Sequence, residues 1–222
     1  MDRSTPRKLG RGVLVALEGI DGTGKTTQGS LLVARLEEEG WPVIATREPT
    51  DGEWGKRIRR LAKEGRGDVL PEEEVEWFLR DRKEHVDKII DPALKRGKIV
   101  VTDRYYFSTM AYQGALGIDP ARIREMNEAI FPRPDLVLLL RADPSVGMDR
   151  IEKRREGEPE VAYEKVGFLS RVADLYETFE DSAIRPVDAA QPPAEVQARI
   201  WSIVGPFLED LARRGDPQSP AA

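Results

Sequence analysis

The sequence predicts an α/β fold: a three-layer, doubly wound, parallel five-stranded sheet with helices on both faces. Two observations carry this prediction. Short apolar runs of strand length alternate with longer segments of helical spacing, an order typical of a parallel sheet covered by helices. In addition, nothing in the middle of the 222 residues resembles a linker, so a single domain is expected.

The individual elements follow from these runs. Strands are predicted at 12–18, 42–46, 98–102, 135–140 and 184–188. Helices are predicted near 25–39, 54–64, 72–95, 105–115, 120–130, 145–155, 163–181 and 193–213. Pro71 opens one of these helices, because proline suits the first turn and the glutamates after it suit the helix dipole. The predicted domain spans 12–213, with a short helical flap (lid) at about 150–163 and flexible tails at 1–11 and 214–222.

The composition limits the partners that the chain can have. Cysteine is absent, which excludes disulfides and thiolate metal sites and favours a cytoplasmic location. The longest apolar run, 136–140, is far shorter than the roughly 20 residues of a membrane span, and residues 1–12 lack the apolar segment of a secretory signal. With 35 basic and 40 acidic residues, the chain has no global bias toward nucleic acid polymers. Its basic residues are therefore expected to act locally, on small anions.

A phosphate-binding loop is the most specific motif. Residues Gly19 to Thr26 match GxxxxGK[ST], and they follow an apolar strand and precede a helix. The glycines let backbone N–H groups converge on one anion, Lys25 can reach the β- and γ-phosphates, and Thr26 can hold Mg²⁺. The alternative is a glycine-rich turn without function, but strand, spacing, Lys-Thr pair and helix all agree. A nucleoside triphosphate is therefore expected to bind at this loop, whose residues are Gly19, Asp21, Gly22, Thr23, Gly24, Lys25, Thr26 and Thr27.

Charged side chains follow two further strands, where ligands bind in such sheets. Asp103 ends an apolar strand, as a magnesium-organising carboxylate does in P-loop enzymes. Arg104 comes next, and Arg47 follows the second strand. Two guanidinium groups beside the loop predict a second phosphate group opposite the first. For each arginine alone, a surface ion pair is the alternative.

Two helices carry less specific signals. Arg150, Arg154 and Arg155 recur at about one turn before a Gly/Pro break, which describes a flap that closes over a nucleotide. A solvated charged face explains the same pattern. On the helix at 72–95, Phe78 and Arg82 share one face and would suit a base, although Phe78 also fits a buried stripe.

These motifs together resemble the thymidylate kinases, which phosphorylate dTMP to dTDP with ATP in dTTP biosynthesis. The matching segments are EGIDGTGKTTQ at 18–28, TREP at 46–49, FLRDR at 78–82, DPALKRGKIVVTDRYYFSTMAYQG at 91–114, PDLVLLL at 134–140 and, less specifically, YEKVGFLSRVADLY at 163–176. The resemblance implies a P-loop kinase fold, ATP and Mg²⁺ as cofactors, and a homodimer formed through helices packed on the sheet.

The resemblance also implies a role for each matching residue. Lys25, Arg104, Asp21, Arg154 and Arg155 would serve catalysis, Arg150 would join the ATP site, and Thr26 and Asp103 would organise the metal. Asp21 would contact the 3′-hydroxyl of dTMP, and Tyr112 would exclude a ribose 2′-hydroxyl. The remaining dTMP contacts would be Arg47 and Arg104 on the phosphate, Phe78 and Arg82 on the base, and Ser108, Thr109 and Gln113 around it.

The sequence departs from the family pattern at three places. Some members carry an arginine in the phosphate loop where this chain has Gly22, so the flap is expected to supply the cation. The flap itself has Ala162 where an arginine often stands, and residues 50–55 replace a glycine-rich continuation. The alternatives are a kinase for another nucleoside monophosphate, a nucleotide-gated switch, or a binding module without turnover. The absence of an NKxD-type guanine reader weighs against a GTPase switch.

Overall fold

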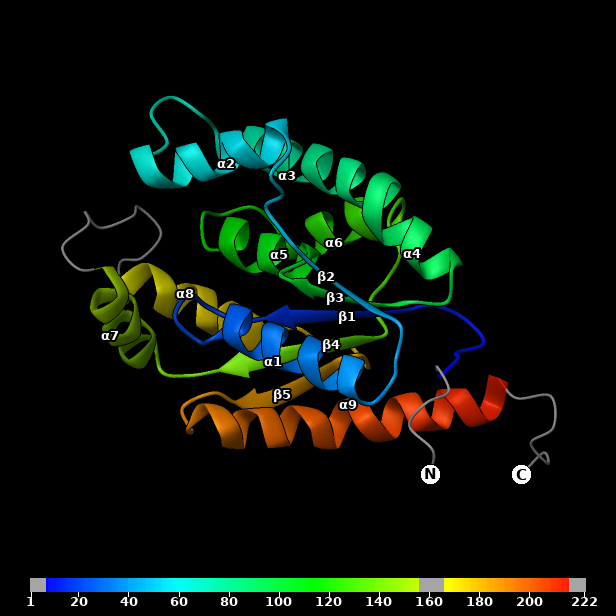
Figure 1. Ribbon diagram of the computed structural model, residues 1–222. Helices are drawn as coiled ribbons and strands as arrows, with labels where there is room; N and C mark the ends of the chain where they lie inside the picture. Colours follow the sequence, from blue (N-terminus) through cyan, green and yellow to red (C-terminus); the bar gives the residue numbers. More distant parts are fainter. Residues whose placement is uncertain (1–6, 156–165, 216–222) are drawn as a thin grey trace.

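The computed structural model describes residues 7–155 and 166–215 (Figure 1). In this part of the chain, five parallel strands form one sheet in the order β2-β3-β1-β4-β5. The strands are β1 (Val13–Glu18), β2 (Val43–Arg47), β3 (Ile99–Asp103), β4 (Leu136–Arg141) and β5 (Ile184–Asp188). Each lies within one residue of its predicted bounds, and the predicted fold class is confirmed.

Helices fill the connections between the strands, and one more helix follows the last strand. They are α1 (Lys25–Glu38), α2 (Glu53–Glu64), α3 (Pro71–His85), α4 (Asp91–Lys95), α5 (Tyr106–Gly114), α6 (Pro120–Glu128), α7 (Pro144–Arg155), α8 (Val166–Glu177) and α9 (Pro193–Gly215). A π-helical turn, η1 (Val86–Ile90), joins α3 to α4, so the helix predicted at 72–95 is a continuous run with a wide turn inside it. The Asp91 N–H bonds the Val86 carbonyl, and Pro92, which has no N–H, follows at once.

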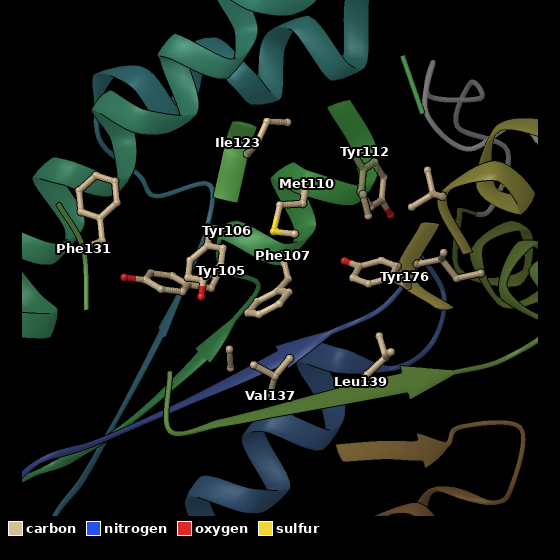
Figure 2. Close-up of a cluster of buried hydrophobic side chains, with 14 of the residues drawn as sticks. Tyr105, Tyr106, Phe107, Met110, Tyr112, Ile123, Phe131, Val137, Leu139 and Tyr176 are labelled. Carbon is tan, nitrogen blue, oxygen red and sulfur yellow. The ribbon is translucent and has the colours of Figure 1, made fainter. Parts of the chain in front are cut away.

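The core consists of two apolar layers, one on each face of the sheet. Strand residues alternate between them: Leu14 and Ala16 of β1 belong to one layer, and Val15 and Leu17 to the other. The first layer packs under α3 to α8 and is rich in aromatic side chains, several of them from α5 (Figure 2). The second packs under α1 and α9. Since β1 is covered on both faces, all six of its residues are buried, as expected for a central parallel strand.

The register of the strands sets the position of the site. Leu17 of β1 and Arg47 of β2 both pair with Asp103 of β3, so the three strands end at the same edge. The loops that carry the predicted motifs leave this edge. Polar groups from segments distant in sequence are therefore expected to meet there.

Residues 7–11 of the predicted N-terminal tail contact the domain. Arg7 pairs with Glu209 of α9 at 2.5 Å and lies over the Trp41 ring, and Arg11 pairs with Asp135 at 2.6 Å. Residues 1–6 and 216–222 of the predicted tails lie outside the described residues. In the described part of the chain, every helix is too short or too polar to cross a membrane.

Candidate active site

The predicted phosphate loop joins β1 to α1 at the C-terminal edge of the sheet. Gly24 is the N-cap of α1 and has a left-handed backbone (φ 90°), which glycine adopts without steric cost. Among the described residues, no side chain caps this helix. The first N–H groups of α1 therefore remain available to an anion, and the helix dipole favours one there.

Lys25 occupies the first position of α1 and folds back over the loop. Its Nζ donates to the carbonyls of Gly19 (2.9 Å) and Ile20 (2.7 Å), and the residue is 6% exposed. Burial, with the nearby Arg104 charge, lowers the pKa of Lys25 to about 8, although Asp21 and Asp103 oppose this change. A bound polyphosphate would favour the charged amine and raise its pKa again.

This pKa predicts proton uptake on nucleotide binding. Above pH 8, much of Lys25 is neutral in the free protein, and a bound polyphosphate would protonate it, so affinity for a nucleoside triphosphate should fall as the pH rises through about 8. Calorimetric titration at about pH 8.5 in two buffers of different ionisation enthalpy measures the uptake. Glu or Asp titration does not interfere at this pH. The Lys25→Gln variant should show none, and equal heats in both buffers for the unmodified protein would contradict the prediction.

Thr26 and Asp103 lie together beside the loop. The Thr26 hydroxyl donates to Asp103 Oδ2 at 2.5 Å, so the second residue of α1 meets the end of β3. A hydroxyl and a carboxylate are hard oxygen ligands, of the kind that bind Mg²⁺ together with water and phosphate oxygens. The two predicted metal ligands thus fit a magnesium ion.

Arg104 lies at the centre of the site and has an unusual backbone. Its φ is 72°, the left-handed region that a non-glycine residue occupies only where its surroundings fix it. The guanidinium donates to Asp21 (2.5 Å), Ser108 (2.8 Å) and Tyr112 (3.2 Å). The Tyr112 hydroxyl also donates to Asp21 at 3.0 Å, so four predicted site residues form one network. The charge of Arg104 helps to keep the pKa of Asp21 low against the effect of burial.

Two cavities adjoin this network. The phosphate-loop cavity, about 300 Å³, is lined by Asp21, Gly22, Gly24, Lys25, Thr26, Thr27, Asp103, Arg104, Arg150 and Ile151. The α3–α5 cavity, about 230 Å³, is lined by Asp21, Pro49, Ile58, Arg59, Ala62, Glu74, Phe78, Arg104, Ser108, Tyr112 and Gln113. Asp21 and Arg104 line both, so they form the boundary between the two. Six residues predicted to bind the acceptor line the second cavity.

Gln113 is the polar group that stands out in the α3–α5 cavity. It is 1% exposed, and among the described residues its Oε1 has no hydrogen-bond partner. A buried acceptor without a donor is costly, so a ligand that supplies an N–H would be favoured once the amide turns this oxygen toward the cavity. Phe78 lines the same cavity and offers an aromatic face. Together they can hold a planar group with one N–H donor.

Arg82 and Thr109 lie behind this cavity and do not line it. The side chain of Arg82 is 1% exposed, and its guanidinium bonds Glu48 twice (2.6 and 2.9 Å), Asn127 (2.5 Å) and Thr109 (3.1 Å). A buried guanidinium requires such partners, and Glu48 supplies the charge. His85 also contacts Glu48, at 3.0 Å. Direct contact of Arg82 or Thr109 with the base therefore stays a prediction.

Arg47 does not share a cavity with Arg104, contrary to the predicted convergence of the two arginines. Its side chain is 62% exposed and pairs with Asp51 at 2.9 Å. It lines a wider groove of about 550 Å³ that also includes Thr26 and Asp103. The strand register brings Arg47 beside Asp103, but the carboxylate of the loop at 50–55 turns the guanidinium away.

Arg59 is a candidate site residue that the sequence motifs do not indicate. It lies on α2 and is the second guanidinium that lines the α3–α5 cavity, besides Arg104. It donates to the carbonyls of Pro49 (2.7 Å) and Thr50 (2.6 Å), and it pairs with Asp51. The available signal was the basic run at 56–60 after the TREP motif, but a run of four basic residues in five does not show which one faces a site.

The loop at 50–55, where the sequence departs from the family pattern, is anchored to α3. The Thr50 N–H and hydroxyl donate to the two carboxylate oxygens of Asp81, at 2.9 and 2.5 Å. Gly55 packs so closely that a Cβ there would lie 1.9 Å from the Thr50 carbonyl oxygen. The changed loop is thus held in place, and its residues Thr50, Asp51 and Gly52 line the wider groove beside Arg47.

The predicted flap at about 150–163 lies only in part within the described residues. Arg150 of α7 lines the phosphate-loop cavity and donates to the carbonyls of Ala189 (2.9 Å) and Gly22 (3.5 Å). Arg154 and Arg155 end α7, and their side chains, like residues 156–165 with Ala162, lie outside the described part of the chain. Their predicted roles stay predictions.

A phosphate loop after the central strand, with a second cavity that shares Asp21 and Arg104 with it, is the architecture of a P-loop phosphotransferase of the nucleoside monophosphate kinase class. The thymidylate kinase family model matches residues 17–200. The chain belongs to the thymidylate kinase family, as the sequence motifs predicted.

Curated relatives agree over nearly the whole chain. A thymidylate kinase from Desulfotalea psychrophila is 44% identical over 198 residues, 89% of this chain and 96% of that protein. A thymidylate kinase from Akkermansia muciniphila is 44% identical over 201 residues, 90% of this chain and 95% of that protein. A probable thymidylate kinase from Archaeoglobus fulgidus is 42% identical over 196 residues, 88% of this chain and 96% of that protein.

Proposed function

We propose that this protein transfers the γ-phosphoryl group of ATP to dTMP and releases dTDP and ADP, a step toward dTTP. The observation that carries the proposal is the pair of cavities that meet at Asp21 and Arg104. One is suited to a triphosphate, and the other combines cations, an aromatic ring and an unpartnered amide oxygen. Family membership supports the same donor and acceptor.

The donor side would hold ATP and Mg²⁺. The N–H groups of the phosphate loop and Lys25 would bind the phosphates, and Arg150 would flank the nucleotide. Thr26 and Asp103 would hold Mg²⁺, directly or through water, and the ion when bound would neutralise charge on the phosphate oxygens. The flap arginines, Arg154 and Arg155, would add cations during transfer.

The acceptor side would hold dTMP. Arg104, with Arg59 or Arg47, would bind its phosphate, and Phe78 would stack on the base. Gln113 Oε1 would accept the N–H at position 3 of thymine; cytosine has an acceptor at that position, so it would leave the buried oxygen unpaired. Asp21 would contact the 3′-hydroxyl, and Tyr112 would lie where a ribose 2′-hydroxyl would be placed.

The reaction requires no covalent intermediate with the protein. An oxygen of the dTMP phosphate attacks the γ-phosphorus in line, the bond to the β–γ bridging oxygen breaks, and ADP leaves with that electron pair. The side chains contribute by positioning two anions and by balancing their charge. Arg104 is well placed for this because it lines both cavities.

The test is an ADP-release assay with Mg²⁺ and ATP against dTMP, dUMP, dCMP, dGMP, UMP and thymidine. We expect dTMP to give the highest kcat/KM, with dCMP lower by about a hundredfold or more because of Gln113. Poor use of UMP would support the role of Tyr112. Preference for another monophosphate would make the protein a kinase for that nucleotide, and ATP binding without turnover would make it a binding module.

We further propose a cytoplasmic homodimer that binds neither nucleic acid polymers nor membranes. Apolar side chains support a contact between copies: among the described residues Leu70, Ile89, Met126 and Ile130 are 36–63% exposed, and they lie on or beside the helices that cover the aromatic core layer. Light scattering during size-exclusion chromatography tests this proposal. A mass of one chain, 25.0 kDa, would contradict it.

A further inference from the structure

A buried carboxylate lies beside the site without lining either cavity. Glu18 ends β1, directly before the phosphate loop, and is 0% exposed. Three neutral donors surround it: the Tyr105 N–H (2.8 Å), the Ser108 hydroxyl (2.5 Å) and the Tyr176 hydroxyl (2.9 Å). Burial raises the pKa of Glu18, and the hydrogen bonds and the nearby Arg104 charge oppose this rise. A charge in such a place is maintained only by its partners.

Two of these donors, the Tyr105 N–H and the Ser108 hydroxyl, link Glu18 to Arg104. The Tyr105 N–H belongs to the peptide that follows Arg104, so Glu18 holds the chain where Arg104 has its left-handed backbone. Ser108 accepts a hydrogen bond from Arg104 Nη1 at 2.8 Å. Because Ser108 donates its single proton to Glu18, a lone pair of the Ser108 oxygen is left to face the guanidinium.

The third donor comes from the helix that follows the flap in sequence. Tyr176 lies on α8, and its ring points from that helix into the aromatic core layer beside α5 (Figure 2). Its hydroxyl lies 3.1 Å from the Ser108 hydroxyl and donates to the same carboxylate oxygen, Oε2. The carboxylate thus joins β1, α5 and α8 at one point.

We propose that Glu18 is a positioning residue for Arg104. Through Ser108 and the Tyr105 peptide it fixes both the side chain and the backbone of Arg104 at the boundary of the two cavities, and Tyr176 holds the carboxylate in place. The guanidinium then lies between two carboxylates: Asp21, in direct contact, and Glu18, through one hydroxyl. This inference rests on the proposed role of Arg104 in binding the acceptor phosphate.

The test compares Glu18→Gln and Tyr176→Phe with the unmodified protein. Glutamine keeps the shape of the Glu18 side chain but places an N–H₂ group among the hydrogen-bond donors that surround it. Phenylalanine at position 176 removes the hydroxyl, while the ring keeps its contact with Phe179. We expect the KM for dTMP to rise about tenfold in Glu18→Gln and about threefold in Tyr176→Phe, with a lower kcat. The KM for ATP should stay within about twofold, since neither replaced side chain lines the phosphate-loop cavity.

Tyr106→Phe is the matched control. The Tyr106 hydroxyl donates to the Glu128 carboxylate at 2.9 Å, the same distance as in the Tyr176–Glu18 pair, but away from Arg104. It should leave both KM values unchanged. If Glu18→Gln and Tyr176→Phe lower only the melting temperature and keep the kinetics of the control, the positioning role is wrong. If Glu18→Gln does not fold, Tyr176→Phe decides alone.

The Arg104→Lys variant distinguishes a wrong positioning role for Glu18 from a wrong proposed function. If Arg104→Lys weakens dTMP use and Glu18→Gln does not, only the positioning role is overturned. If Arg104→Lys retains normal dTMP kinetics, the assigned role of Arg104 fails and the positioning role fails with it.

Discussion

Replacing Arg104 with alanine is expected to lower kcat/KM for dTMP by at least about a hundredfold, since removal of one charge-stabilising contact typically costs on the order of 3 kcal/mol in the barrier. The structure gives the reason. Arg104 lines both cavities, so in the proposed reaction its charge would face the acceptor phosphate and the γ-phosphate together. ATP affinity should change little, because the loop N–H groups and Lys25 remain. Alanine keeps the Cβ, so the left-handed backbone strain at φ 72° is not relieved.

Steady-state kinetics with each substrate varied in turn, together with ATP titration calorimetry, measures both effects. Arg133→Ala is a suitable control, because Arg133 is 55% exposed and pairs with Asp181 and Glu128 away from both cavities. Arg104→Ala should also leave Asp21 without its guanidinium partner, so the melting temperature of this variant is expected to fall modestly. Near-normal turnover of dTMP by Arg104→Ala would refute the assigned role.

The sequence predicted the sheet well because its signals are local. Apolar strand runs end in the residues that carry chemistry, and parallel strands bring these ends to one edge. The structure accordingly has Thr26 in contact with Asp103, and Asp21 in contact with Arg104, at this edge. The phosphate loop needed only the residues next to it in sequence.

Side-chain direction was harder to predict, because it depends on partners far away in sequence. Arg82 shares a helix face with Phe78, but Glu48 and Asn127 draw its guanidinium behind the cavity. Likewise Asp51 pairs with Arg47 at the surface, and Arg59 lines the cavity in its place.

Glu18 was missed for a related reason. Its role depends on hydroxyls from α5 and α8, and the distance along the chain to Tyr176 is 158 residues. A lone glutamate at the end of an apolar strand indicates that something must satisfy it, but the sequence alone does not indicate what.

Gly22 occupies a position where some thymidylate kinases carry an arginine. Its packing predicts that no larger residue fits at this position. A Cβ at Gly22 would lie 2.1 Å from the Gly147 carbonyl oxygen, and the backbone φ is 81°. Gly22→Ala should therefore displace α7 or the phosphate loop. Because a misplacement of about 1 Å can cost a hundredfold in rate, we expect kcat/KM for ATP to fall by about that factor. An arginine introduced at this position would begin with the same clash.

Substitution of Gly147, the residue packed against Gly22, distinguishes a steric clash from backbone strain. Gly147 lies in the first turn of α7 and has no positive φ, yet a Cβ there would lie 2.6 Å from the Asp21 carbonyl oxygen. Alanine is otherwise favoured over glycine in a helix by about 1 kcal/mol, so any loss in Gly147→Ala must come from this contact. Gly117→Ala is the opposite control, because it has a φ of 100° and no described atom within 4 Å. The contrary result is normal kinetics in Gly147→Ala while Gly22→Ala and Gly117→Ala lose similar amounts of stability. In that case backbone strain explains why glycine is required at positions 22 and 117. Direct contact of α7 with the phosphate loop then has no effect on activity. Loss of activity in Gly22→Ala and Gly147→Ala, but not in Gly117→Ala, would show that the first helix of the flap controls the phosphate loop through this contact.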